Sequence, residues 1–206
     1  LGHMFNINEG IGITVRKITS KYLKDFPNEE FRLGDGVFVI SKEEAQGLGK
    51  EIIKPFVKNS DITKYVYKKN QDFLIYLTRY DDINIYPETK KYLLKFKTIL
   101  DDQILKYEEL FPWYALNRPR SKELFEDNDK IILPYRSKVN AFAYSNEPIY
   151  GSRDVLYITK KNLNYEIKSL VAVLNSKLMY FWLFNKGKRK GDILEMVQAP
   201  VSEIPL

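Results

Sequence analysis

The chain of 206 residues is long enough for one domain, or for one domain with a small appendage, and its 44% apolar residues can build a core. It has no Cys, which excludes disulfide scaffolds, thiolate zinc sites and cysteine nucleophiles. The net charge is +6, and residues 130–190 hold twelve Lys and Arg against three Asp and Glu. A basic excess concentrated in this way is typical of a surface that binds polyanions.

The first residues are set apart from the rest. Leu1-Gly2-His3-Met4 is typical of a cloning remnant, so we predict that the folded domain covers residues 5–206. Because His3 is the only histidine, none is then left for acid–base or metal chemistry. The longest apolar stretch, residues 170–184, has polar residues at 175–177 and is too short to span a bilayer. We expect a cytoplasmic protein with no signal peptide and no membrane partner.

Short elements are predicted in the first half of the chain. Apolar and β-branched residues predict one or two strands within residues 5–19, a strand at 36–40 and another at 73–77. Residues 41–48 begin with a serine N-cap followed by two acids, so a short helix is expected there.

Two longer helices are predicted further along. Residues 87–110 begin with a proline, which suits a first turn, and carry an apolar stripe at Leu93, Phe96, Leu100, Ile104 and Tyr107. Residues 165–184, with Asn164 as N-cap, carry a second stripe at Ile167, Leu170, Val171, Leu174, Leu178 and Phe181. After it, four cations between Asn185 and Gly191 predict a mobile basic loop: Lys186, Lys188, Arg189 and Lys190.

Residues 130–158 are predicted to form three short strands with exposed cations and aromatic rings. Ile131–Leu133 is typical of a buried strand, which Pro134 ends. Arg136, Lys138 and Asn140 are spaced by two, so a continuous strand would place them on one face. Their guanidinium, ammonium and amide groups suit phosphates and base edges. A half-exposed β-meander with ordinary surface charge would show the same pattern.

A loop between these regions carries two aromatic residues and two arginines: Trp113, Tyr114, Arg118 and Arg120. Such a loop can stack bases and hold phosphates. The alternative is that the two rings anchor the core and the two arginines are solvated.

Catalytic motifs are missing from the sequence. It has neither a Gly-rich phosphate loop nor the Asn-Pro-Pro-aromatic tetrad of amino-methyltransferases, and we predict no catalytic residue and no metal ligand. One alternative is a small magnesium-dependent nuclease, because residues 127–130 contain an acid–x–Lys element and Asp101 or Asp102 lies upstream. A second alternative is a protein-interaction module that docks a methylase or nuclease subunit.

The chain resembles the TaqI-like C-terminal specificity domain, the target-recognition domain of adenine-specific methyltransferases from restriction–modification systems. Blocks that match the family follow its order over roughly residues 10–206: Ile53-Lys54-Pro55-Phe56, Asp61-Ile62 with Tyr65, Phe73-Leu74-Ile75-Tyr76, Tyr92-Leu93 through Leu100, Trp113-Tyr114 with Arg118-Pro119-Arg120, Lys130-Ile131-Ile132 with Pro134, Asn140-Ala141-Phe142-Ala143 and Leu174-Asn175-Ser176-Lys177-Leu178. Asp102-Gln103 departs from the family, whose members often carry a basic residue there.

The resemblance implies a module that recognises double-stranded DNA and is not itself an enzyme. It would be a C-terminal fragment of a type IIG or type I-like enzyme, some of which also carry an endonuclease domain. A separate N-terminal methyltransferase domain, in the same or a partner chain, would bind S-adenosylmethionine and methylate a flipped adenine. No cofactor is therefore expected in this chain.

The expected architecture is α+β, with a mixed, mostly antiparallel sheet backed by the two amphipathic helices. The predicted DNA-binding surface combines three groups of residues. The aromatic-arginine loop contributes Trp113, Tyr114, Arg118 and Arg120. Candidates for base edges are Arg136, Lys138, Asn140 and Arg153, and candidates for phosphate contacts are Lys186, Lys188, Arg189 and Lys190.

Overall fold

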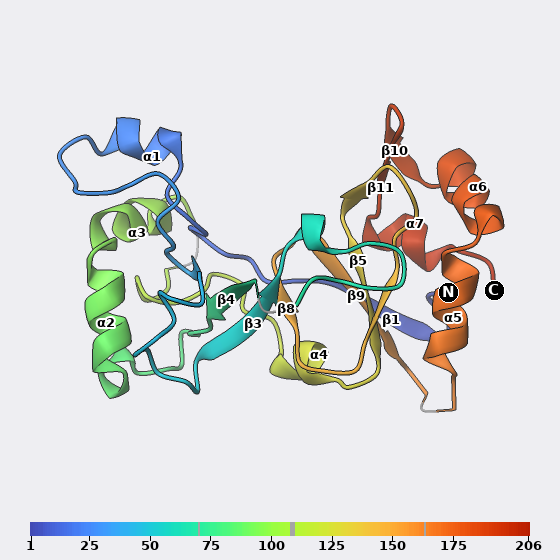
Figure 1. The fold of residues 1–206 in the computed structure, drawn as a ribbon, viewed down its shortest axis with the longest axis horizontal. Coiled ribbons are helices and arrows are strands. Elements are labelled where there is room, and N and C mark those ends of the chain that lie inside the picture. The colour runs from blue at the N-terminus through green and yellow to red at the C-terminus, as the bar shows by residue number, and fades with distance from the viewer. Residues whose placement is uncertain (70, 108–109, 163) are drawn as a thin grey trace. The chain divides into compact units, whose positions relative to one another are not determined.

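The computed structural model shows a chain that folds into two compact units (Figure 1) and describes residues 1–69, 71–107, 110–162 and 164–206. Unit 1 is built from residues 1–11, 57–69 and 120–206. Unit 2 is built from residues 12–56 and 70–119, so both of its segments lie within the sequence of unit 1. Helices and antiparallel strand pairs occur together, which confirms the predicted α+β class.

The main sheet of unit 1 has the strand order β1-β9-β5-β7, with antiparallel neighbours. Its strands are β1 (Phe5–Glu9), β5 (Lys130–Pro134), β7 (Ala143–Ser145) and β9 (Val155–Lys160). Strand β5 is buried along its whole length, as its apolar run predicted. It ends at Pro134, which has no backbone N–H to extend the ladder.

Each face of this sheet is covered. Ile131, Leu133 and Ile158 belong to one hydrophobic core with helices α5 (Ile167–Leu174), α6 (Lys177–Lys186) and α7 (Gln198–Ser202) (Figure 1). Tyr157 has the opposite parity in β9, and its ring lies 5.1 Å from that of Phe125 in α4 (Lys122–Glu126). Because side chains alternate along β9, this strand packs against α5, α6 and α7 on one face and against α4 on the other.

A second, three-stranded antiparallel sheet in unit 1 has the order β10-β11-β6. It consists of β6 (Arg136–Ser137), β10 (Lys188–Lys190) and β11 (Ile193–Glu195). The prediction of a mobile loop at these cations was wrong, because Gly191, at φ +60°, closes a two-residue turn that pairs β10 with β11. Unit 1 also contains the short strand β8 (Tyr150–Gly151) and the 3₁₀ turn η1 (Asn59–Asp61).

Unit 2 contains the antiparallel strands β2 (Val39–Ile40), β4 (Asp72–Ile75) and, up to Phe56, β3 (Ile53–Val57), with β4 in the middle. Its helical elements are α1 (Ser20–Asp25), η2 (Ile83–Ile85), α2 (Pro87–Leu94) and α3 (Lys97–Ile104). The short helix predicted at residues 41–48 is a series of turns instead. Ser41 and Glu44 do exchange the hydrogen bonds of a helix N-terminus, but Gly47, at φ +83°, interrupts the segment.

Both long predicted helices are broken. The first divides into α2 and α3 at Lys95–Phe96, and its predicted residues 108–109 lie outside the described residues. The second divides at Asn175–Ser176, where α5 and α6 meet at 67°. This second helix begins after Glu166, whose side chain accepts a hydrogen bond from Lys168 N, and not after the predicted N-cap Asn164. Because the bend turns α6, Leu178 and Phe181 are 75% and 66% exposed and do not continue the buried stripe.

Within the described part of the chain, no single helix is long and apolar enough to cross a membrane, and only the bent pair α5 and α6 reaches the required length and composition together.

Residues 1–4 lie within unit 1. The Leu1 side chain is buried in the core, and its ammonium group donates a hydrogen bond to Ile204 O. Burial lowers the pKa of this ammonium group. The origin of these residues as a cloning remnant stays a prediction, but Leu1 is part of the folded core of unit 1.

Candidate nucleic-acid interface

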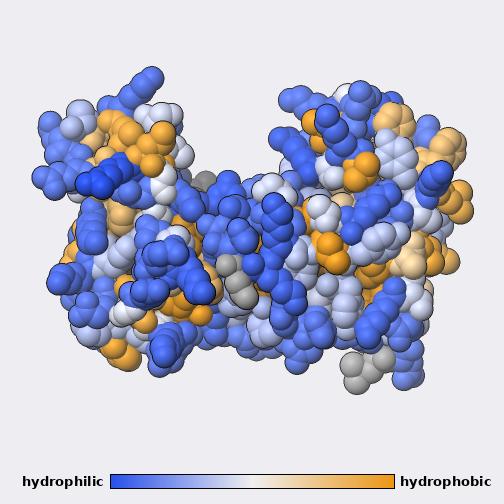
Figure 2. All heavy atoms as spheres, viewed as in Figure 1, coloured by the Kyte–Doolittle hydropathy of each residue, from blue (hydrophilic) through white to orange (hydrophobic). Residues whose placement is uncertain are grey.

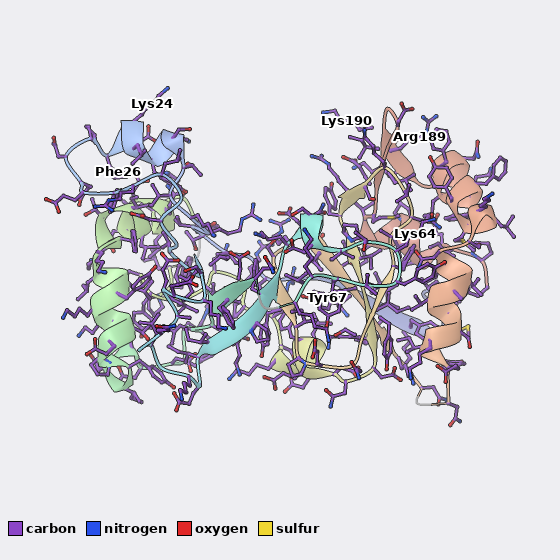
Figure 3. All side chains as sticks on the ribbon, viewed as in Figure 1. Lys24, Phe26, Lys64, Tyr67, Arg189 and Lys190 are labelled. Carbon is purple, nitrogen blue, oxygen red and sulfur yellow. The ribbon has the colours of Figure 1, made fainter. Side chains whose placement is uncertain are left out.

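Exposed cations gather on the three short strands β6, β10 and β11, which we call the basic sheet. Lys188, Arg189 and Lys190 form the whole of β10 and are all exposed, and Arg136 of β6 is exposed as well. Figure 3 shows Arg189 and Lys190 on the β10–β11 hairpin of unit 1. Residues 167–191 contain six Lys and Arg and no Asp or Glu, so no acid in that stretch offsets the field of β10.

Glu195 in β11 organises two of these cations. It lies opposite Lys188 on one side and Arg136 on the other, and its side chain is only 7% exposed. Its Oε1 accepts hydrogen bonds from Arg136 Nε at 3.0 Å and Nη2 at 2.7 Å, and Lys188 Nζ lies 3.4 Å from Oε2. The hydrogen bonds from Arg136 lower the pKa of Glu195, and the same contact raises the pKa of Arg136. One carboxylate thus orients two cations and neutralises one of them.

The position of Arg136 is fixed from two further directions. Its guanidinium carbon lies 5.2 Å from the centre of the Tyr135 ring, a cation–π distance. Its backbone forms a reciprocal pair with the Asn59 side chain, in which Asn59 Nδ2 donates to Arg136 O at 3.0 Å and Arg136 N donates to Asn59 Oδ1 at 3.1 Å. The side chain is nevertheless 54% exposed. Arg136 is therefore both oriented and accessible, as a contact to a base edge requires.

Arg189 is also held in place. Its guanidinium carbon lies 4.3 Å from the centre of the Phe184 ring at the end of α6, and its Nη1 donates to Gly191 O at 3.1 Å. Lys186 is exposed in the last turn of α6, where the helix dipole favours a cation. The structure therefore brings the four predicted phosphate-binding residues together beside Arg136.

The residues predicted beyond β6 lie differently. Lys138 is exposed, but Asn140 is fully buried, and its Nδ2 donates to Leu174 O at 2.7 Å and to Ser176 O at 3.0 Å. The prediction that Asn140 contacts a base edge was wrong for this structure. The spacing argument assumed a continuous strand, but β6 ends at Ser137 and the chain then turns inward.

Arg120 and Arg153 share a different carboxylate. Arg120 Nη2 lies 3.5 Å and Arg153 Nε 3.7 Å from Glu9 Oε2, and Arg120 Nε donates to Gly10 O at 3.3 Å. Arg120 lines a hollow whose lining also includes Glu9, Glu123 and Asp127. These acids make the hollow unfavourable for a phosphate group. Arg120 and Arg153 are thus brought together with each other, not with Arg136.

The remaining predicted residues belong to unit 2. Trp113 and Tyr114 are half-buried with their rings edge to face, and Tyr114 Oη donates to Asp81 O at 2.9 Å. Lys97 Nζ lies 5.6 Å from the centre of the Trp113 ring, and Arg118 is exposed. The basic sheet, in contrast, lies wholly in unit 1.

Sequence reasoning missed Glu195 and Asn59. Nothing in the local pattern marks them, because each acts on Arg136 from a position 59 or 77 residues away. Only the pairing of β11 with β6 and the position of η1 reveal their role.

The acid–x–Lys element of the nuclease alternative has a structural role. Lys130 is buried, and its Nζ donates to Glu147 O at 2.7 Å and to Asp127 O, while Asp129 is paired with Lys160. Asp101 and Asp102 belong to unit 2, where they pair with Lys97 and Lys106. Among the described residues, no group of three or more His, Cys, Asp or Glu is placed to hold a metal ion.

Burial lowers the pKa of Lys130 to about 8, although Asp127 and Glu147 partly oppose this shift. In the unfolded chain the pKa of a lysine is about 10.4. Between about pH 8 and 10.4 the unfolded chain therefore binds more protons at Lys130 than the folded chain does. The free energy of unfolding is expected to rise with pH through that window, by at most about 1.4 kcal/mol per pH unit. Below about pH 8 Lys130 is protonated in both states, so its contribution to the free energy of unfolding should not change with pH.

Urea unfolding of the protein and of Lys130→Met, measured at several pH values, checks this prediction. The variant retains every other titrating group. As the pH rises above about 8, the unfolding free energy of the unaltered protein should therefore increase relative to that of Lys130→Met. Parallel curves would contradict the lowered pKa.

The chain is similar to known proteins in sequence and in fold. The family model of the TaqI-like C-terminal specificity domain matches residues 54–206. The type II methyltransferases M.HincII and M.HindII, both from Haemophilus influenzae, are each 32% identical over 114 residues, which are 50% of this chain and 23% and 22% of the relatives. The match thus spans less than a quarter of their length.

Among solved structures, the type IIL restriction-modification enzyme MmeI in complex with DNA has a TM-score of 0.58 at 16% identity, over 95% of this chain and 24% of that chain. At this identity the likeness is one of fold. The family model, in contrast, covers well over half of the chain. The chain therefore belongs to the family of TaqI-like C-terminal specificity domains.

Proposed function

We propose that this specificity domain recognises a base sequence in duplex DNA for an adenine-specific methyltransferase of a restriction–modification system. A separate N-terminal methyltransferase domain would bind S-adenosylmethionine and transfer the methyl group, and any endonuclease activity would also lie outside this chain. The observation that carries the proposal is the basic sheet, in which accessible cations surround an Arg136 held by Glu195. Its relatives M.HincII and M.HindII are named as methyltransferases, which supports the proposal.

The contacts divide into two kinds. Lys186, Lys188, Arg189 and Lys190 bind phosphates, which raises affinity without discriminating between sequences. Arg136 contacts a base edge in the major groove, where a guanidinium pairs best with guanine O6 and N7. Glu195 occupies Nε and one N–H of Nη2 on one edge of the guanidinium, so a guanine would be contacted through Nη1 and the second N–H of Nη2.

Fluorescence anisotropy with a random-sequence duplex, from about 50 to 200 mM salt, tests the proposal. Several phosphate contacts should change the affinity by orders of magnitude over this range. Absence of binding at the lowest salt would contradict the proposal for this chain.

Replacing Arg136 by alanine should cost about 1–3 kcal/mol of binding to a duplex selected by the protein, and much less on a scrambled duplex. The reason is that a base contact is lost, not only a charge. Arg32→Ala is a matched control, since it removes one exposed guanidinium from unit 2. The measurement is the ratio of the dissociation constants for the two duplexes, and an equal loss on both would remove Arg136 from the base-reading set.

A protein-interaction module is the second candidate, and one observation favours it. Leu178 and Phe181 are exposed on α6, and Figure 2 shows hydrophobic side chains at the surface of this helix. Binding through such a face should survive high salt better than binding to phosphates does. The expected partner is again the N-terminal methyltransferase domain.

A further inference from the structure

The segment that follows η1 ends in a tight hairpin with two exposed apolar side chains at its tip. Ile62 and Tyr67 form an antiparallel bridge, and Thr63 N and Oγ1 both donate to Val66 O, at 3.0 and 3.1 Å. The tip therefore consists of residues 63–66. Two of its side chains project into solvent, with Tyr65 53% and Val66 62% exposed.

The backbone of Tyr65 has a conformation that large residues avoid. Its φ is +75°, and within the described ranges only Arg120 shares a positive φ among residues other than glycine. A bulky residue in this region is strained by about 1 kcal/mol or more, and Gly or Asn would be favoured on stability grounds. The exposed ring makes too little contact with the core to explain why a tyrosine stands there.

The conformation is held by the neighbouring strand segment. Tyr65 N donates to Phe142 O at 3.0 Å, and Tyr144 N donates to Tyr65 O at 3.3 Å. Lys64 Nζ, in the same tip, donates to Asn175 O at 3.2 Å, where α5 ends. These contacts hold the backbone of the tip, and with it the direction in which the Tyr65 and Val66 side chains leave the chain.

The tip is continuous with the proposed DNA interface. The segment begins at Asn59, whose side-chain amide is paired with the backbone of Arg136 in the basic sheet. The chain then leaves the hairpin through Lys68 and Lys69, which are exposed. Figure 3 shows Lys64 of this tip on unit 1, the unit that also carries Arg189 and Lys190.

We propose that Tyr65 and Val66 form a wedge that enters a groove of the bound duplex and partly unstacks one base step. The proposal rests on the DNA recognition proposed above and adds a contact that deforms the duplex. Apolar wedges act in this way in other DNA-binding proteins, and pyrimidine–purine steps deform most easily. The ring of Tyr65 supplies a stacking surface, and Val66 fills the adjacent space.

The test uses a duplex enriched by this chain from a random pool, in which each adenine is replaced in turn by 2-aminopurine. The fluorescence of this base rises when it is unstacked. Tyr65→Asn removes the ring and suits the positive φ, whereas Tyr65→Phe keeps the ring. Tyr80→Asn is the matched control, because Tyr80 is 91% exposed in unit 2.

The expected result is a fluorescence rise at one step with the unaltered chain and with Tyr65→Phe and Tyr80→Asn. Tyr65→Asn should lose that signal and bind about ten-fold more weakly, in the range of one lost base–aromatic stack, while its melting temperature stays equal or rises. A purely structural role would instead lower the melting temperature.

Two results would overturn the wedge and leave the proposed function standing. In the first, the chain enriches a sequence but no 2-aminopurine position responds. In the second, Tyr65→Asn keeps both the affinity and the signal, or loses affinity only together with thermal stability. If the chain enriches no sequence at all, the proposed function itself fails, and the wedge fails with it.

Discussion

Replacing Lys188, Arg189 and Lys190 together by alanine is expected to weaken binding to duplex DNA about a hundred-fold or more at roughly 50 mM salt. The three side chains make up an entire exposed strand, and no carboxylate other than Glu195 pairs with them in the described residues. If each binds one phosphate, the slope of log Kobs against log salt should become shallower by about 2.7, since each contact contributes about 0.9.

The matched control removes three lysines from unit 2, at positions 90, 91 and 95 in and after α2. It lowers the net charge by the same amount, so a long-range effect of charge would appear in both triple variants. Affinities are measured by anisotropy over the same salt series. Equal losses in both variants would show that β10 has no special place in the interface.

Replacing Asn175 by alanine is expected to lower the free energy of unfolding by about 1–3 kcal/mol, because one buried backbone group, Phe142 N–H, loses its partner. The Asn175 side chain is buried between α5 and the segment before β7. Its Oδ1 accepts from Phe142 N at 3.0 Å, and its Nδ2 donates to Phe142 O at 2.7 Å and to Val171 O at 3.0 Å. Val171 O keeps the backbone N–H of residue 175 and Phe142 O keeps that of Tyr65, but Phe142 N becomes unsatisfied.

Asn185→Ala is the matched control for this variant. Asn185 lies on α6, is exposed, and makes a single side-chain hydrogen bond to Phe181 O. Its loss should change stability by less than about 0.5 kcal/mol, as is usual for surface positions. Urea unfolding midpoints measure both effects. Similar midpoints for the two variants would contradict the structural role assigned to Asn175.

The sequence predicted the elements that local chemistry determines. The apolar run Ile131–Leu133 is the buried strand β5, ended by Pro134, and Pro87 begins α2 as expected. The concentration of basic residues after Lys130 also marked the part of the chain that carries the basic sheet. These features depend on neighbours within a few residues, which a pattern records directly.

The errors arose where distant partners decide the structure. The apolar stripe through residues 165–184 predicted one helix, but Ser176 caps α6 and Asn175 bonds to Phe142, so the helix breaks between them. Asn140 has the spacing of an exposed strand residue, yet it is buried against the same break. Periodicity contains no information about contacts made across more than thirty residues.

The pairing of β1 with β9 has a consequence for the order of folding during synthesis. Phe5 pairs with Lys160, so the first strand of unit 1 has no partner until more than 150 further residues have been made. Unit 2, in contrast, is complete at residue 119. Contacts between such distant residues close slowly, and domains fold as they emerge from the ribosome. The segment that becomes β1 therefore stays unpaired while unit 2 can already fold.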